Sequence, residues 1–251
     1  MNSTSMSIQA SLPHDIALKI ASSLQVADLC SLGSCSQFWW ELCGSDYIWE
    51  SLCRERWPAL SLEIEESSSF DNQTHEEWRV FYIRKHNEVA GKAAGVIEFV
   101  NRCLAFESIE VGHYLKAVRE LDVMQFGFED ARTFFLKSKH NVLLNLIGLH
   151  YCIIWLGLPG ECVMEVLSNC NISQRQVRVQ WWKLGRWFYG FRLRDELHTR
   201  NVSLEDLATG KEEEVLGVLH RGAVHEVIRV QISAAKPAYT SWSFQSAQDP
   251  N

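Results

Sequence analysis

The sequence predicts an α+β protein that is mainly α-helical, with a small antiparallel β-containing part near its C-terminus. Apolar residues recur at helical spacing between residues 12 and 58, and residues 142–158 form the most hydrophobic run. From residue 176 onward, apolar and polar residues alternate as in a strand. The expected parts are a flexible tail (1–10), a helical module (11–58), a linker (59–74), a helical region (75–170), a β-containing region (171–235) and a flexible tail (236–251).

Composition limits the class of protein. The chain has 251 residues and a net charge of −7, which argues against nucleic acid as a general partner. Its eight cysteines form no CxxC pair and no Cys/His cluster of zinc-site spacing, so we expect reduced thiols, no metal site and no cofactor. Scattered thiols and the absence of a recognisable signal peptide predict an intracellular protein, cytoplasmic and/or nuclear.

The N-terminal module reads as three short helices and a last turn. The first carries apolar residues at helical spacing, and Pro13 suits its first turn. Gly33 is expected to end the second helix in a left-handed conformation. Ser34 and Gln37 have the spacing of a capping box that opens the third helix, and Ser45 with Asp46 caps the last turn.

The module offers more apolar side chains than about 45 residues can bury alone. Two interpretations follow: these side chains pack on the rest of this chain, or they form a partner surface. The stretch also resembles an F-box, the helical module that joins a substrate receptor to a Skp-type adaptor of a cullin–RING ubiquitin ligase. The matching residues, in order, are Leu12, Pro13, Asp15, Ile20, Leu24, Asp28, Leu29, Leu32, Trp39, Leu42, Ser45, Asp46, Ile48 and Trp49.

The match departs from the usual pattern at Ser23, Ser34 and Cys35–Ser36. The resemblance implies a Skp-family adaptor (of the ASK type in plants) as partner, with a cullin and a RING subunit joined through it and an unknown protein as substrate. The remainder of the chain, with its WWKLGRW run, resembles the plant Skp-interacting-partner group of F-box proteins. The residues expected to dock on the adaptor, as interface or as core, are Leu12, Pro13, Ile16, Ile20, Leu24, Leu29, Leu32, Trp39 and Trp49.

The middle of the chain predicts further helices. An acidic, Ser-rich stretch, residues 61–73, reads as a solvated linker, with phosphorylation of Ser67–Ser69 as the alternative. A helix with a Thr74/Glu77 capping box follows, and Gly91 and Gly95 are expected to interrupt it. Helices are also expected at residues 109–121 and 128–138.

Residues 142–158 predict a central buried helix. A membrane span needs about 20 apolar residues, whereas this run has 17 and includes Asn145 and His150. We therefore expect no membrane partner and interpret His150 as a hydrogen-bonded core residue. A short helix is expected near residues 161–167.

The C-terminal part predicts strands. Residues 177–182 alternate, residues 183–186 read as a turn, and residues 187–193 are again strand-like. Residues 215–220 and 224–232 flank Arg221–Ala223 as a hairpin candidate.

Residues 176–194 interleave six aromatic residues with five basic ones. Three interpretations compete: a protein-binding surface, a single-strand nucleic-acid platform, or strand aromatics that face the core beside solvated arginines. The candidate substrate-binding residues are Trp181, Trp182, Arg186, Trp187, Tyr189 and Arg192.

No motif indicates an enzyme: GxSxG, Walker-type, HExxH and Rossmann patterns are absent. A thiol–base pair of Cys162 or Cys170 with His150 is conceivable, but no sequence feature brings them together. A substrate receptor needs no catalytic residue, because other subunits perform the transfer.

Overall fold

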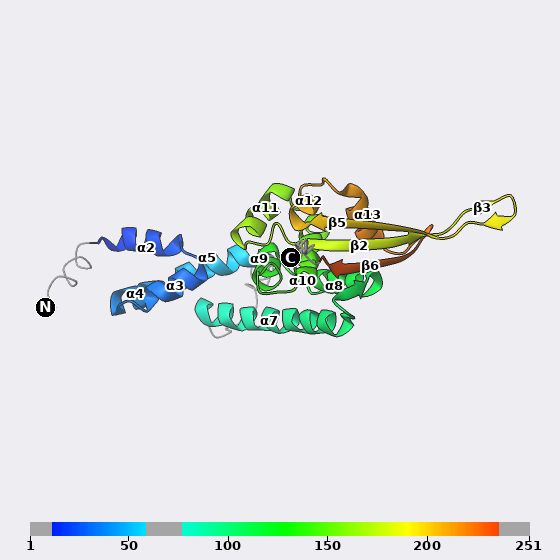
Figure 1. Cartoon of the computed structure of the whole chain (residues 1–251). Coiled ribbons are helices and arrows are strands. Elements are labelled where there is room, and N and C mark those ends of the chain that lie inside the picture. The colour runs from blue at the N-terminus through cyan, green and yellow to red at the C-terminus, as the bar shows by residue number, and fades with distance from the viewer. Residues whose placement is uncertain (1–11, 59–76, 236–251) are drawn as a thin grey trace, which may run out of the picture. The chain divides into compact units, whose positions relative to one another are not determined.

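The computed structural model describes residues 12–58 and 77–235 (Figure 1). The chain divides into two compact units, residues 1–94 and 95–251. The predicted Thr74 cap, the Ser67–Ser69 stretch and both expected tails lie outside the described residues.

The N-terminal unit contains α2 (His14–Ser22), α3 (Val26–Gly33), α4 (Gln37–Cys43), α5 (Asp46–Arg56) and the first part of α7 (Trp78–Cys103). The expected last turn after Ser45 is thus an 11-residue helix. The expected capping box is wrong by two positions, because Ser36 rather than Ser34 caps α4 and its Oγ accepts a 3.4 Å hydrogen bond from the Trp39 amide.

Gly33 does not adopt the left-handed conformation that the sequence predicted. It is buried, and a Cβ there would lie 3.4 Å from Cys43 Cβ. The glycine therefore allows close packing of α3 and α4 rather than a special backbone angle.

Aromatic residues join α5 to α7 within this unit. Trp49 and Tyr82 pack edge to face with ring centroids 5.3 Å apart, and Trp57 lies on the same Tyr82 ring. Asp46 Oδ1 accepts a 3.1 Å hydrogen bond from the Trp78 amide, at the first residue of α7.

The prediction that Gly91 and Gly95 interrupt a helix is wrong. Helix α7 runs through both, and a Cβ at either position would meet no atom within 4 Å. A solvent-exposed glycine costs a helix only about 1 kcal/mol relative to alanine, which packing of the other face offsets.

The C-terminal unit is built around helix α10 (Val142–His150), in which every residue from Leu143 to His150 is buried. This confirms the expected buried helix, although the α-helix ends early. A π-helical turn η1 (Tyr151–Trp155) continues it, with a 3.0 Å hydrogen bond from the Leu156 amide to the Tyr151 carbonyl. The remaining helices are α8 (Val111–Val123), α9 (Phe128–Phe134), α11 (Gly160–Asn169), α12 (Leu204–Ala208) and α13 (Glu213–Arg221).

A four-stranded antiparallel sheet has the order β1-β6-β2-β5. Its strands are β1 (Ser108–Glu110), β2 (Gln176–Lys183), β5 (Glu196–Ser203) and β6 (Val227–Ala234). Helix α10 contacts β6 and β2, and α8 contacts β6 and β1. Helices and strands thus share the compact unit of residues 95–251.

Two strand predictions are corrected. Residues 215–220 belong to helix α13, whose buried residues Val215, Val218 and Leu219 have helical spacing. Residues 187–193 form a hairpin of two short strands, β3 (Trp187–Phe188) and β4 (Phe191–Arg192), rather than one strand. Tyr189 and Gly190, with φ of 44° and 84°, make the turn between them.

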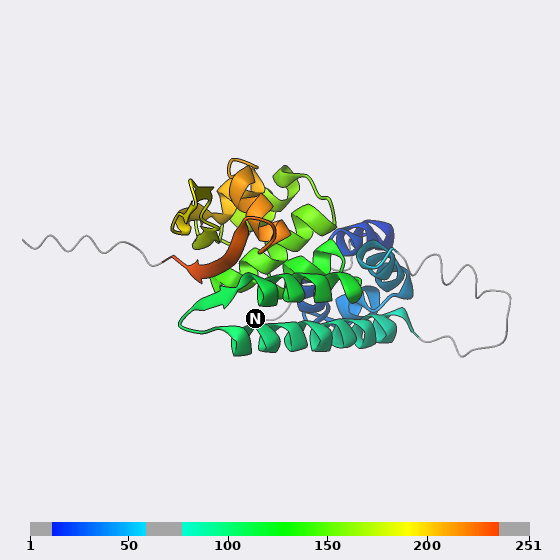
Figure 2. The ribbon, with the colours of Figure 1, turned by 90° about the vertical axis from the view of Figure 1, so that its right-hand side faces the viewer.

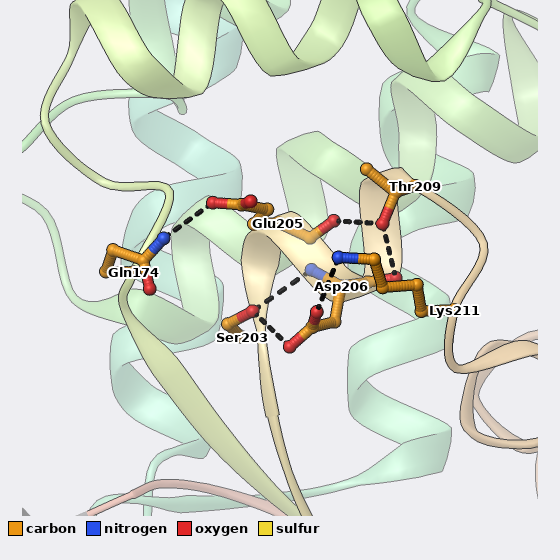
Figure 3. Close-up of polar contacts among 6 residues, drawn as sticks. All are labelled: Gln174, Ser203, Glu205, Asp206, Thr209 and Lys211. Atoms are coloured by element: carbon orange, nitrogen blue, oxygen red, sulfur yellow. Dashed lines mark hydrogen bonds and ion pairs between the residues drawn. The ribbon is translucent and has the colours of Figure 1, made fainter.

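The end of β5 is fixed by a side-chain cap (Figure 3). Ser203 Oγ accepts a 3.0 Å hydrogen bond from the Asp206 amide and donates one of 2.6 Å to the Asp206 carboxylate. Gln174, just before β2, donates a 2.6 Å hydrogen bond to Glu205. These bonds lie where β5 ends and α12 begins.

Candidate protein-interaction surfaces

Helix α2 presents isoleucines to solvent on one side. Ala17 and Ala21 are fully buried, whereas Ile16 and Ile20 are 47 % and 43 % exposed. Their four-residue spacing places Ile16 and Ile20 on the same face of the helix, and the preceding Pro13 is also exposed. This helix therefore carries an apolar face that the described residues leave open.

The other residues expected at the adaptor surface differ in burial. Leu29 and Trp49 lie in the core of the N-terminal unit, and Trp49 Nε1 donates a hydrogen bond to the Cys43 carbonyl. Their side chains stabilise the helices and offer no free surface. The half-buried members of the set are Leu12, Leu24, Leu32 and Trp39.

Two exposed aromatic residues of this unit were missed. Trp40 and Tyr47 are 59 % and 65 % exposed. Trp40 borders a hollow of about 220 Å³ whose lining includes Leu29, Cys30 and Gly33. The adjacent pair Trp39–Trp40 was the available signal, because neighbouring residues of a helix cannot share one face.

The Trp/Arg segment divides between core and solvent. Trp181 is 1 % exposed and stacks on His198 with ring centroids 5.3 Å apart, so it cannot contact a partner directly. Trp182 lies on the opposite, open face of the sheet, where the Arg229 guanidinium lies 5.1 Å from its ring centroid. Among the candidate substrate-binding residues, therefore, Trp181 alone fits the interpretation that the strand aromatics face the core.

The other candidates lie on the β3–β4 hairpin, which extends beyond the ends of β2 and β5 (Figure 1) and is seen end-on in Figure 2. Trp187 and Tyr189 are 73 % and 88 % exposed, and Arg186 and Arg192 are exposed as well. The hairpin also exposes Phe188, Phe191 and Leu193, which sequence reasoning did not select. Such a concentration of exposed aromatic residues makes the hairpin a candidate interaction site.

The base of this hairpin is held rigidly. The Leu193 amide donates a 2.9 Å hydrogen bond to the Arg186 carbonyl, and the Gly185 amide donates one of 2.9 Å to Asp195 Oδ1. Asp195 also pairs with Arg192 at 2.8 Å. These bonds, led by the one from Gly185, lower the pKa of the Asp195 carboxyl and keep it charged. A Cβ at Gly185 would lie 2.0 Å from the Leu193 carbonyl oxygen, so only glycine fits there.

Comparison with known families concerns the part of the chain that contains the Ile16/Ile20 face of α2. Residues 9–55 match the family model described as F-box-like. The match covers the N-terminal helices, called the F-box-like domain, and no more of the chain. F-box domains bind Skp-family adaptors in general, and F-box proteins are generally non-catalytic substrate adaptors. No curated protein and no solved structure matches the chain.

The F-box-like domain contains α2 to α5, so the exposed isoleucine face of α2 belongs to it. The matched residues do not reach the β3–β4 hairpin, which lies outside the domain. The family match therefore bears on the N-terminal helices and not on the hairpin.

The conceivable thiol–base pair has no support in the geometry. Tyr114 Oη and His150 Nδ1 lie 2.7 Å apart in the core, where burial lowers the pKa of His150 to about 4. Cys162 is exposed and Cys170 is half-buried, whereas His150 is buried, and no hydrogen bond of the described residues joins His150 to either thiol. Within residues 12–58 and 77–235 no three acidic, cysteine or histidine side chains gather as a metal site, and no helix there is long and apolar enough to span a membrane.

Proposed function

We propose that this chain is the substrate-recognition subunit of a Skp–cullin–F-box ubiquitin ligase. The observation that carries the proposal is the exposed Ile16/Ile20 face of α2 within the F-box-like domain. In this role, Pro13, Ile16 and Ile20 contact a Skp-family adaptor, of the ASK type if the plant resemblance holds. Leu29 and Trp49 shape the surface from beneath.

The C-terminal unit then binds the target through the β3–β4 hairpin, with Trp187, Tyr189, Arg186 and Arg192 as contacts. Aromatic residues and arginine are the residues most enriched at energetic centres of interfaces. Holding the target beside the conjugating enzyme raises the effective concentration of its lysines, which requires no catalytic group in this chain.

The test is direct binding of the full chain to a purified Skp-family adaptor. Ile16→Asp/Ile20→Asp is expected to weaken binding more than tenfold, because each change buries a carboxylate in an apolar interface. The matched control is Ile83→Asp, since Ile83 is an equally exposed isoleucine (48 %) on α7 of the same unit. Equal affinities for wild type and the double variant would exclude this docking surface.

A second candidate function has one observation in its favour. Exposed aromatics beside arginines on the hairpin are also what a single-strand nucleic-acid platform uses. A non-ligase scaffold of this kind predicts salt-dependent binding of an oligothymidylate that Arg186→Ala weakens. Adaptor binding without such an affinity favours the ligase role.

A further inference from the structure

Strand β5 is an open edge of the sheet. It is eight residues long and pairs only with β2 among the described strands. Residues 196–201 are exposed except for the half-buried His198, so neither helices nor loops of the described chain cover this edge. Natural proteins normally shorten, bend or cover an edge strand because its free backbone groups pair with other chains.

The register shows which backbone groups are free. The Leu204 amide bonds to the Arg175 carbonyl and the Ala235 amide to the Gln176 carbonyl. Odd-numbered residues of β2 therefore face β5, and their partners in β5 are His198, Arg200 and Val202. The backbone amides and carbonyls of Leu197, Thr199 and Asn201 consequently point outward, and no described residue bonds to them.

The side chains beside this edge favour an apolar residue at one position of an added strand. Leu197 is 54 % exposed and lies opposite Trp182 on the open face of the sheet. An added strand places alternate side chains on that face, within reach of this pair.

Charge indicates the chemistry of the partner. Residues 176–201 contain six Lys/Arg and two Asp/Glu, a local charge of +4 in a chain whose net charge is −7. Because β5 continues directly into the β3–β4 hairpin, a strand added to β5 also reaches the exposed arginines and aromatics there (Figure 1).

We infer that the target is captured as an extended acidic segment that adds a strand to β5 and continues onto the β3–β4 hairpin. Main-chain hydrogen bonds to Leu197, Thr199 and Asn201 supply affinity, and the basic side chains select acidic sequences. This inference rests on the proposed receptor role and names the substrate class that the role requires.

The key variant is Thr199→Pro, which removes one outward amide but leaves the amides that bond to β2 in place. Thr199→Val is the matched control, because it changes the side chain and keeps the amide. Random peptides long enough to span β5 are displayed on phage and selected against the full chain. Enriched peptides are expected to be acidic, and Thr199→Pro is expected to bind them at least about tenfold more weakly than Thr199→Val.

A second measurement uses the enriched peptide itself and changes nothing in the protein. N-methylation of one alternate set of its residues is expected to abolish binding, and methylation of the other set to leave binding intact. No enrichment, basic enriched peptides, or equal loss from both methylated sets would overturn the inference. Displacement of the peptide by an oligothymidylate would also overturn the inference if the oligothymidylate bound wild type and Thr199→Pro equally well.

The edge has one other conceivable occupant, a second copy of the chain. Concentration-dependent dimerisation that Thr199→Pro abolishes in the absence of peptide would assign the edge to that role and overturn the inference. The adaptor assay separates the two proposals. Lost peptide binding with intact adaptor binding removes strand addition alone, whereas lost adaptor binding with intact peptide selection removes the ligase role.

Discussion

Trp49 Nε1 donates a 2.8 Å hydrogen bond to the carbonyl oxygen of Cys43, and both groups are buried. The bond joins the first turn of α5 to the last residue of α4, across the turn at Gly44 and Ser45. Trp49, which the F-box resemblance left open as interface or core, thus holds two helices of the domain together.

Replacing this residue tests its role as core rather than contact. Trp49→Phe removes the donor and leaves the Cys43 carbonyl unsatisfied, so it is expected to cost about 1–3 kcal/mol of unfolding free energy. Adaptor affinity of the folded variant is expected to stay unchanged. Trp40→Phe, at an exposed tryptophan on α4, is the control and is expected to cost less than about 0.5 kcal/mol. Chemical denaturation and adaptor titration together check both; weakened adaptor binding by folded Trp49→Phe would contradict the assignment.

Two helical glycines are expected to respond to alanine in opposite directions. At Gly148 of α10 a Cβ would lie 2.7 Å from Phe135 Cβ and 3.2 Å from Leu136 Cδ2, both in the core. Gly148→Ala is therefore expected to destabilise by about 1–3 kcal/mol through overpacking. Gly91→Ala on α7 meets open space and is expected to stabilise by roughly 0.5–1 kcal/mol. Denaturation midpoints that move in the same direction would refute this packing argument.

The sequence predicted those elements in which one pattern dominates. Continuous apolar residues identified α10, and the alternation of Val177, Val179 and Trp181 identified β2. Alternation also separated Trp181 from Trp182, but it cannot say which face is covered, because that depends on where α10 packs.

The errors arose where local signals conflicted. In α13, the valines Val215 and Val218 favoured a strand. The acidic residues Glu213 and Glu214 at the start and the basic residues His220 and Arg221 at the end fit the helix dipole instead. Weighing the charges would have found the helix. The hairpin turn at Tyr189–Gly190 had only one signal, the glycine, inside an aromatic run that reads as a single strand.

Arg175, the residue directly before β2, forms hydrogen bonds with the loop that follows α9. Its guanidinium donates to the His140 carbonyl at 2.6 Å, to Asn145 Oδ1 at 2.9 Å and to the Ser138 carbonyl. Lysine lacks the planar fork that serves several acceptors at once, so Arg175→Lys is expected to cost about 2 kcal/mol. Hydrogen exchange is expected to rise in residues 137–141 first. Unchanged exchange there would show that the loop does not depend on Arg175.

Acid sensitivity is expected from His150. Burial, together with the charge of nearby His220, lowers the pKa of His150 to about 4. Burial also raises the pKa of Tyr114 well above its usual value, so the Tyr114 hydroxyl keeps its proton and forms a hydrogen bond of 2.7 Å with His150 Nδ1. The folded state therefore holds a neutral imidazole, whose Nε2 has no hydrogen-bond partner among the described residues.

Acid is expected to destabilise the folded state, because its His150 takes up a proton less readily than His150 of the unfolded chain. The unfolded chain takes up this proton near the ordinary pKa of 6.5 and the folded chain only near 4, so stability is full above pH 6.5 and falls as the pH drops toward 4. His150→Gln retains an acceptor for Tyr114 but does not titrate. Relative to this variant, wild type is expected to lose roughly 2 kcal/mol of unfolding free energy between about pH 7.5 and about pH 5. Parallel pH profiles of the two proteins would show that His150 takes up its proton in the folded core as readily as in the unfolded chain, and that burial does not keep it neutral.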